Sequence, residues 1–223
     1  MDIVGFGEHH VFVATGRGDG TFNPARPVIL NNMTIGSGGW EIAKQPRLLG
    51  DVTGDGKPDI VAFGDEGVQV AVNKGDGTFY PPKHAYGNGF SHKAWGWHAQ
   101  KYPRFLADVN GDGKLDIVGF GDAGVYIAIS NGDGTFQQPK LVLGDFGYSA
   151  GGWRVEKHLR IPVDITGDGS ADIVGFGENS VLVSYNDGKG NFSSPVKRLT
   201  DEFAFRNGEW DISKTVRFVT NLF

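Results

Sequence analysis

A short hydrophobic segment recurs along this chain at an almost constant interval. The sequence Asp-Ile-Val-Gly-Phe-Gly, or its Ala-containing variant, starts at positions that are 57, 57 and 56 residues apart: Asp2, Asp59, Asp116 and Asp172. Two further markers, a Trp and an Arg, keep the same register in all four copies: Trp40, Trp97, Trp153 and Trp210, and Arg47, Arg104, Arg160 and Arg217. A fixed period of this length predicts four structural repeats.

Each repeat is predicted to contain four short strands separated by turns. In the third copy the β-rich runs cover residues 104–107, 116–120, 125–129 and 141–146. Gly accounts for 36 of the 223 residues, which disfavours helices because glycine weakens a helix interior. Four strands per repeat are the content of one propeller blade. The sequence therefore predicts an all-β protein, a β-propeller of four-stranded blades, with residues 1–223 as a single repeat domain.

The chain starts and stops inside the repeating unit. Residues 2–4 match the second strand of a repeat, and residues 214–219 match the first strand. One blade is therefore expected to be split between the N- and C-termini. Pairing of these two segments would close a ring and leave no exposed sheet edge.

Charge and composition exclude several classes of protein. The chain has 21 basic and 26 acidic residues, so no basic surface for nucleic acid is expected. It contains no Cys, which excludes disulfides and thiolate chemistry. No apolar run approaches the roughly 20 residues of a membrane-spanning helix, and no signal peptide is recognised near Met1. A soluble chain is expected, in a compartment that the sequence leaves open.

An acidic nine-residue loop lies between the first two strands of three repeats. Its first, third, fifth and ninth side chains offer oxygen ligands, its seventh residue offers a carbonyl, and a Gly at the sixth position permits a sharp turn. The pattern resembles the calcium loops of integrin-type propellers and predicts structural calcium. The alternative is a turn in which the carboxylates bond backbone N–H groups. The candidate ligands are Asp108, Asn110, Asp112, Lys114 and Asp116; Asp51, Thr53, Asp55 and Asp59; and Asp164, Thr166, Asp168 and Asp172. The Asp108 loop is favoured because its third residue is Asn rather than Thr.

Each repeat also carries the pattern Trp-x-x-x-Lys-x-x-Arg after a Gly-containing loop. A flat indole packs well against the CH face of a sugar ring, while neighbouring polar groups bond the sugar hydroxyls. The alternative is that the Trp residues form the core between blades and that Lys and Arg are surface or ion-pair groups. A single Trp favours the core, whereas the repeated unit favours a sugar pocket.

Residues 147–158, Gly-Tyr-Ser-Ala-Gly-Gly-Trp-Arg-Val-Glu-Lys-His, together with Asp172–Asn179, resemble the fungal lectin family of Psathyrella velutina. The likeness extends over all four repeats and into Lys214–Arg217. The resemblance implies a non-catalytic, seven-bladed β-propeller that binds N-acetylglucosamine-type ligands in pockets between blades, with some calcium loops.

The resemblance selects the pocket of Trp153 as the best sugar site. Trp153 would stack on the sugar, Arg154, Glu156 and His158 would supply hydrogen bonds, and Tyr148 lies in the preceding loop. The residue equivalent to His158 differs in every other copy, where it is Gln45, Tyr102 or Thr215. Trp40 is therefore the second candidate, and the pockets of Trp97 and Trp210 are expected to be altered or inactive.

The repeat number departs from that family. Seven blades turn by about 51° each, four would need about 90°, and eight would need about 45°. Two alternatives stay open. An eight-bladed ring built from two chains, a homodimer, is slightly favoured over a four-bladed monomer closed by its own termini.

These features together predict a multivalent lectin for glycans that bear N-acetylglucosamine or related N-acetylated sugars. The alternative is an integrin-like platform for protein–protein interaction, with structural calcium loops. Catalysis is not expected, because the acidic residues occupy repeated, equivalent loops instead of one asymmetric constellation.

Overall fold

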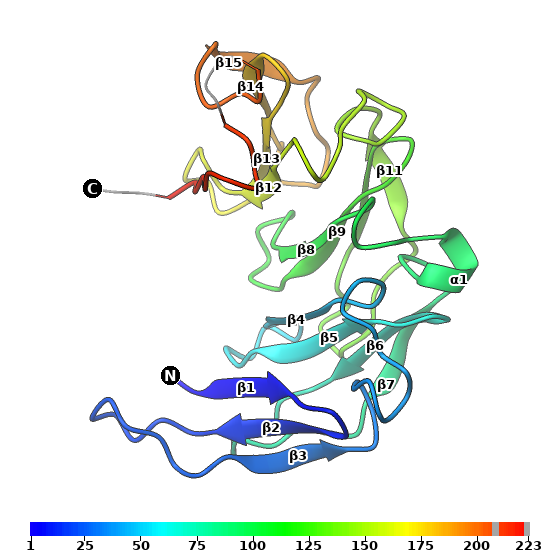
Figure 1. The fold of residues 1–223 in the computed structure, drawn as a ribbon, viewed down its shortest axis with the longest axis vertical. Coiled ribbons are helices and arrows are strands. Elements are labelled where there is room, and N and C mark those ends of the chain that lie inside the picture. The colour runs from blue at the N-terminus through cyan, green and yellow to red at the C-terminus, as the bar shows by residue number, and fades with distance from the viewer. Residues whose placement is uncertain (207–209, 221–223) are drawn as a thin grey trace. The chain divides into compact units, whose positions relative to one another are not determined.

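The computed structural model describes residues 1–206 and 210–220. In this part of the chain the regular elements are short strands and one helical turn, which confirms the all-β prediction (Figure 1). The elements are β1 (Ile3–Phe6), β2 (His10–Ala14), β3 (Arg26–Leu30), β4 (Arg47–Gly50), β5 (Asp59–Phe63), β6 (Gly67–Ala71), β7 (Lys83–Gly87), α1 (His92–Trp95), β8 (Arg104–Ala107), β9 (Asp116–Phe120), β10 (Val125–Ala128), β11 (Lys140–Leu143), β12 (Arg160–Val163), β13 (Asp172–Phe176), β14 (Ser180–Ser184) and β15 (Val196–Thr200).

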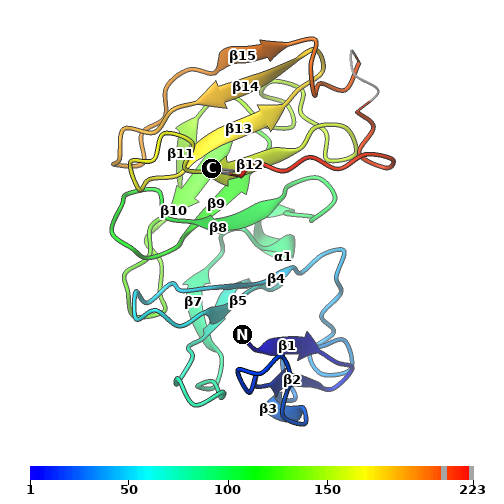
Figure 2. The same ribbon diagram turned by 90° about the vertical axis from the view of Figure 1, so that its left-hand side faces the viewer.

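The strands form four antiparallel sheets, one for each repeat. Sheet 1 has the order β1-β2-β3, sheet 2 β4-β5-β6-β7, sheet 3 β8-β9-β10-β11 and sheet 4 β12-β13-β14-β15. Figure 2 shows the strands of sheet 4 side by side in this order. Three sheets thus have the four strands of a blade, and sheet 1 has three.

The chain divides into two compact units. One comprises Met1–Ala99 with Ser130–Phe136 and holds sheets 1 and 2, and the other comprises Gln100–Ile129 with Gln137–Phe223 and holds sheets 3 and 4. Whether the repeats form a single domain stays a prediction.

The four sheets repeat each other in detail. In each four-stranded sheet the first strand pairs with the second in one register: Arg47 opposite Ala62, Arg104 opposite Gly119, and Arg160 opposite Gly175. In all four sheets the outermost pair of strands carries an irregularity at the same place, between 11 and 12, 68 and 69, 125 and 126, and 181 and 182. Such bulges increase the local twist of a sheet. The repeat in the sequence is therefore also a repeat in the three-dimensional structure.

The core of each unit lies between two stacked sheets. In the first unit Val11 and Val13 of β2 pack with Ile60 and Ala62 of β5, and in the second unit β9 packs with β13 in the same way. Strands β5, β9 and β13 are buried at every residue. Their continuous apolar sequences are typical of strands covered on both faces.

Two local features depart from the predicted strands. Strand β11 ends at Leu143, because Phe146 adopts a left-handed backbone conformation with φ of 57° that a strand does not accommodate. The repeat around Trp97 contains the one-turn helix α1, which ends at Gly96 with φ of 66°. The interval from Phe90 to Trp97 is the same as that from Phe146 to Trp153, so the helical turn replaces a loop of equal length.

The predicted split blade involves β1 of the first unit and residues 216–219 of the second unit. Sheet 1 supplies three strands, and residues 216–219 form no strand within the described part of the chain. Their pairing with β1 stays a prediction. Within the described residues, no helix is long and apolar enough to cross a membrane.

Candidate functional site

The repeated Trp is part of a buried structural unit. Trp153 is only 3% exposed and packs on Phe146, with ring centroids 4.8 Å apart. Its indole Nε1 donates to Asp145 Oδ1 at 3.2 Å. The guanidinium of Arg160 lies 5.9 Å from the indole centroid and donates from Nη1 to the carbonyl of Phe146 at 2.8 Å. The burial of Trp153 therefore agrees with the alternative in which the repeated Trp belongs to the hydrophobic core. Stacking of Trp153 on a sugar stays a prediction.

The same unit recurs in the other copies. Arg47 donates to the carbonyl of Met33 at 3.1 Å, and Arg217 donates to the carbonyl of Phe203 at 2.9 Å. Trp40 and Trp97 are also buried. Burial lowers the pKa of Arg160 to about 10, which leaves the guanidinium charged at neutral pH.

The carboxylate of Glu178, next to this unit, bonds two other side chains. His158 Nε2 lies 2.9 Å from Glu178 Oε2, and Arg206 Nε lies 2.6 Å from Glu178 Oε1. The backbone N–H of Arg154 donates to His158 Nδ1 at 3.1 Å. Because Nδ1 accepts this bond, Nε2 carries the proton and donates to Glu178. Burial lowers the pKa of His158, so the imidazole is neutral at pH 7.

The Trp40 copy builds the same arrangement from different residues. Gln45 accepts at Oε1 from the backbone N–H of Glu41 at 2.6 Å and donates from Nε2 to Asp65 Oδ1 at 2.6 Å. Lys93 Nζ lies 3.1 Å from Asp65 Oδ2. The amide of Gln45 thus reproduces the acceptor and donor of a neutral histidine. The sequence indicated Gln45 as a departure from His158. In this copy the replacement preserves both hydrogen bonds.

A third version occurs at Tyr102. Its hydroxyl donates to Asp122 Oδ1 at 3.3 Å, and Lys101 Nζ lies 3.8 Å from the same oxygen. The pattern of an acidic residue holding a polar side chain and a cation is thus present in three copies.

Sequence reasoning missed this acidic position. An Asp or Glu follows every Phe-Gly of the recurring segment, at Glu8, Asp65, Asp122 and Glu178. Its recurrence in all four copies was the available signal. It was overlooked because the residue lies outside the Trp-x-x-x-Lys-x-x-Arg pattern.

A cavity of about 340 Å³ opens next to the Trp40 arrangement. Its size lies at the lower end of the range for small-molecule sites. The lining combines an apolar wall, from the indole of Trp40, with amide, carboxylate and ammonium groups. The polar residues are Asn32, Gln45, Asp65, Glu66, Gln69, His84 and Lys93.

The remaining predicted residues of the Trp153 pocket have different roles. Arg154 donates from Nη1 to the carbonyl of Tyr148 at 2.7 Å, and its guanidinium lies 3.6 Å from the centroid of the Tyr148 ring. Lys101 Nζ lies 3.9 Å from the same centroid. Two cations therefore lie close to the ring of Tyr148. Glu156 is exposed, and within the described residues no hydrogen bond joins its side chain to Glu178 or His158.

Trp97 and Trp210 belong to copies that were expected to be altered. Trp97 packs edge-on against Phe90, with centroids 5.0 Å apart. Trp210 packs against Phe203 at 4.9 Å and is half-buried, unlike the other three.

The acidic loops form hydrogen-bonded turns. Asp108 accepts from the N–H groups of Gly111 and Gly113 at 2.7 and 2.8 Å, and Asp51 and Asp164 make the equivalent bonds. Lys114 Nζ lies 2.7 Å from Asp112 Oδ2, and Lys57 Nζ lies 2.8 Å from Asp55 Oδ2. Among the described residues, no group of three or more acidic or His side chains is placed to hold a metal ion. The turn alternative accounts for these contacts, and calcium stays a prediction.

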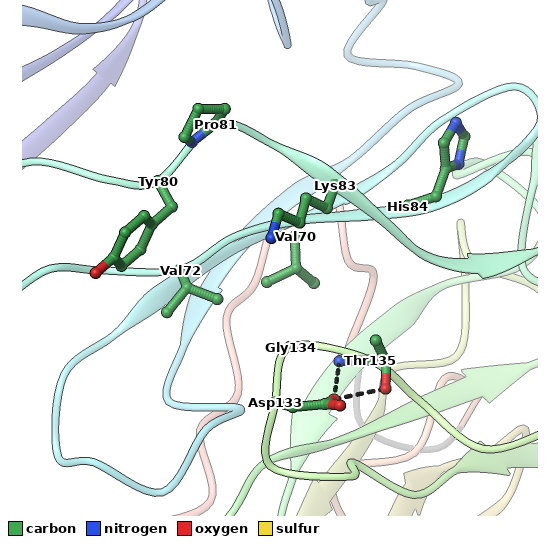
Figure 3. Close-up of a pocket in the computed structure, with 9 residues that line it drawn as sticks. All are labelled: Val70, Val72, Tyr80, Pro81, Lys83, His84, Asp133, Gly134 and Thr135. Atoms are coloured by element: carbon green, nitrogen blue, oxygen red, sulfur yellow. Dashed lines mark hydrogen bonds between the residues drawn. The ribbon is translucent and has the colours of Figure 1, made fainter.

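A second cavity of the first unit, of about 290 Å³, lies between β6, the segment before β7 and the turn at Asp133 (Figure 3). Its floor contains Val70 and Val72, and Tyr80 at its rim is 53% exposed. Asp133 Oδ1 already accepts from both the N–H and the hydroxyl of Thr135. The other repeats have Asn23, Gln137 and Ser193 at the position of Tyr80. This cavity is therefore not a repeated feature, and it is the weaker candidate.

Comparisons with known proteins agree with this architecture. A family model described as an FG-GAP-like repeat matches residues 51–100 and 108–156. The solved structure of an Agrocybe aegerita lectin, described as specifically recognising non-reducing terminal N-acetylglucosamine, is 54% identical with a TM-score of 0.89. The alignment covers 95% of this chain and 51% of the lectin chain, so this chain spans about half the length of that lectin.

A more distant structure shares the fold alone. The Tc holotoxin pore of Photorhabdus luminescens is 21% identical, with a TM-score of 0.59, over 90% of this chain and 9% of that one. Among curated proteins, no match to this chain is found. The resemblance to the fungal propeller lectins and the assignment of the sheets as propeller blades are thereby confirmed.

Proposed function

We propose that this chain, which shares its repeats and its blade sheets with the fungal lectin family of Psathyrella velutina, binds glycans that end in N-acetylglucosamine. The observation that carries the proposal is the repeated carboxylate, which holds a neutral hydrogen-bond donor and a cation beside a buried indole. The 54% identity to a lectin described as recognising terminal N-acetylglucosamine supports the choice of sugar. The proposed role is binding rather than catalysis.

The Trp40 cavity has the chemistry that a sugar requires. A carboxylate offers about four acceptor positions, so Asp65 can accept sugar hydroxyls beyond its bonds to Gln45 and Lys93. Asn32 and Gln69 add amide groups that both donate and accept. The indole of Trp40 supplies an apolar wall against which a CH face or an acetamide methyl group can pack.

Repetition of the cleft gives multivalency. A single shallow cleft binds weakly, but several clefts on one surface raise the overall affinity for a glycan-coated surface by about 10² to 10⁴ when the geometry permits simultaneous contact. We infer that the copies of Trp40 and Trp153 are the functional clefts of one chain, because in both one side chain accepts from a backbone N–H and donates to the carboxylate.

Calorimetry with N-acetylglucosamine tests the proposal. The Asp65→Asn and Glu178→Gln variants are each expected to lose at least tenfold in affinity at one cleft, because hydrogen bonds to charged groups contribute about 1.5–3 kcal/mol. The stoichiometry should fall by one cleft in each variant and by both in the double variant. These variants test the proposal more directly than Trp153→Ala does, because removal of the buried Trp153 ring would also disturb the core.

Asp133→Asn is the matched control, because Asp133 lines the cavity of Figure 3 and lies outside the proposed clefts. Unchanged sugar binding in this variant is expected. Loss of binding in Asp133→Asn but not in Asp65→Asn would move the site to that cavity. Capture of protein ligands that free N-acetylglucosamine does not compete away would favour the protein-interaction platform instead.

Calcium is a secondary part of the proposal. If the acidic loops bind the ion, millimolar calcium should raise the melting temperature relative to chelator, since a ligand that binds only the folded state stabilises it. The loop of Asp164 has Ser170 where the other two have a lysine, so it has no lysine ammonium of its own to compete with the ion. An Asp164→Asn variant should then lose the largest part of the shift. Equal melting temperatures with calcium and with chelator would remove calcium from the proposal.

A further inference from the structure

The cavity of Figure 3 differs from the Trp40 cavity in its lining and in its charge. It has a volume of about 290 Å³ and lies between β6, the segment before β7 and the turn at Asp133. Val70, Val72 and Pro81 are its aliphatic residues. Of its described lining residues, His84 alone also borders the Trp40 cavity. The first unit therefore offers two separate binding surfaces.

The space in this cavity results from a small residue on β6. The next repeat has Ile127 at the position of Val70. A turn covers this position in both repeats. A Cβ added at Gly134 would lie 3.5 Å from Cγ1 of Val70, and a Cβ added at the equivalent Gly190 would lie 2.8 Å from Cδ1 of Ile127. Because valine has no Cδ1 atom, the volume that isoleucine fills in the next repeat stays open here.

The ring of Tyr80 gives the cavity an aromatic rim. Tyr80 is 53% exposed, and Nζ of Lys74 lies 5.0 Å from its ring centroid. The other repeats have Asn23, Gln137 and Ser193 at this position. An exposed ring beside an aliphatic floor can pack against a flat apolar molecule. This aromatic rim is therefore specific to the second repeat.

Two lysines place positive charge above the aliphatic floor. Lys83 extends from β7 toward Val70, as Figure 3 shows. Within the described residues, no carboxylate forms an ion pair with its ammonium. Lys74 adds a second positive charge at the ring of Tyr80. An apolar floor below an unpaired ammonium is complementary to a molecule with an apolar body and one negative end.

The other two titratable residues of the lining make less contact with this space. Asp133 Oδ1 accepts from both the N–H and the hydroxyl of Thr135, at 2.9 and 2.6 Å, which holds the carboxylate at its own turn. Figure 3 shows the imidazole of His84 directed away from that turn. The lysines therefore determine the sign of the charge next to Val70 and Tyr80.

We propose that this cavity is a second binding site of the chain, for a small organic anion whose flat apolar body packs between Tyr80 and Val70 and whose carboxylate meets Lys83. The volume is close to the lower end of the range for small-molecule sites, which suits a ligand of one or two rings. Burial of the apolar body supplies most of the affinity, and the charge-assisted bond to Lys83 fixes the orientation. The site does not depend on sugar binding at the Trp40 cavity.

Calorimetry with 2-naphthoate as the probe tests the charge preference. One saturable site per chain is expected. The neutral 2-naphthamide should bind about three- to tenfold more weakly, and the cationic 2-naphthylmethylamine more weakly still. Equal affinity for the three probes, or tighter binding of the amine, overturns the proposal.

Two variants that copy the next repeat test the position of the site. Val70→Ile should lower the affinity for 2-naphthoate by about tenfold or more, because the added methyl group occupies the space of the ligand. Its melting temperature should stay equal or rise, since that space is empty without ligand. Tyr80→Gln, a change at the exposed rim, should lower the affinity by about three- to tenfold. Unchanged affinity in both variants places the probe elsewhere and overturns the proposal.

Lys83→Gln and Lys140→Gln form a matched pair, because Lys140 holds the equivalent position in the next repeat, where Ile127 fills the space. Lys83→Gln should weaken binding of 2-naphthoate by about three- to tenfold and affect 2-naphthamide less. Lys140→Gln should leave the affinity for both probes unchanged. An equal loss in the two variants would reflect general attraction to positive charge and overturns the proposal. Displacement of 2-naphthoate by N-acetylglucosamine would place the probe in the Trp40 cavity and overturns it as well.

Discussion

The arrangements around Trp153 and Trp40 reach one geometry with different chemistry. In the first, a neutral histidine links the Arg154 N–H to Glu178, and in the second, the amide of Gln45 links the Glu41 N–H to Asp65. The histidine can gain a proton as the pH falls, and the amide cannot. The comparison teaches that the repeat conserves a pattern of donor and acceptor atoms and leaves the residue type free.

The two arrangements also differ in the residues that pack against the indole. Phe146 lies opposite Gly175 in one, whereas Met33 and Ala62 share the space in the other. In each pair a larger residue faces a smaller one. Replacing only one member of a pair by its counterpart from the other copy should therefore disturb the packing.

Exchange of one member of such a pair should have the largest effect. Gly175→Ala would place a Cβ against Trp153 and Phe146, both of which are buried, and overpacking of this kind costs about 1–3 kcal/mol of unfolding free energy. Chemical denaturation measures the loss. Addition of Phe146→Met, which copies the Trp40 cleft, should recover most of it. A Gly175→Ala variant as stable as the wild type would show that the rings shift to make room.

Exchange of His158 for glutamine should have an intermediate effect that depends on pH. Burial lowers the pKa of His158, so the folded state resists protonation. Its contribution to stability is therefore present above the ordinary pKa of about 6.5 and is lost as the pH falls through the lower, folded value.

His158→Gln should bind sugar like the wild type at neutral pH and should show a flatter dependence of melting temperature and sugar affinity as the pH falls toward about 5. His158→Ala is the contrasting variant, because it removes the link to Glu178. Parallel pH profiles for His158→Gln and the wild type would show that another group is responsible.

Removal of the exposed cations should have the smallest effect. Arg206 and Lys93 pair with Glu178 and Asp65 at the surface, with side chains 69% and 62% exposed. Exposed ion pairs contribute about 0–1 kcal/mol, so Arg206→Ala and Lys93→Ala should change the melting temperature little and lower sugar affinity less than the carboxylate variants do. A loss in either variant as large as that in Glu178→Gln would make the cation the main sugar contact.

Much of the fold was predictable from the sequence because it depends on local pattern. The strands 104–107 and 116–120 were expected with the bounds that the structure has, since apolar runs alternate there with Gly-Asp turns. The end of β11 was not, because the left-handed conformation of Phe146 is imposed by the burial of its ring next to Trp153.

The candidate site was less predictable. The Trp positions and His158 were identified from the sequence, but the carboxylate that organises each cleft was missed. Glu178 follows His158 by 20 residues, and antiparallel pairing of β12 with β13 brings the two side chains together. A pairing of that kind is not visible in a local motif.

The sequence by itself determined the number of repeats, their strands and the chemistry available in each copy, because periodic hydrophobicity and turn residues act over a few neighbours. Only the tertiary structure decided that the indole is mostly buried, that Glu178 and Asp65 organise the clefts, and that the acidic loops bond their own backbone. These outcomes depend on which side chains meet across sheets and on how much water remains between them.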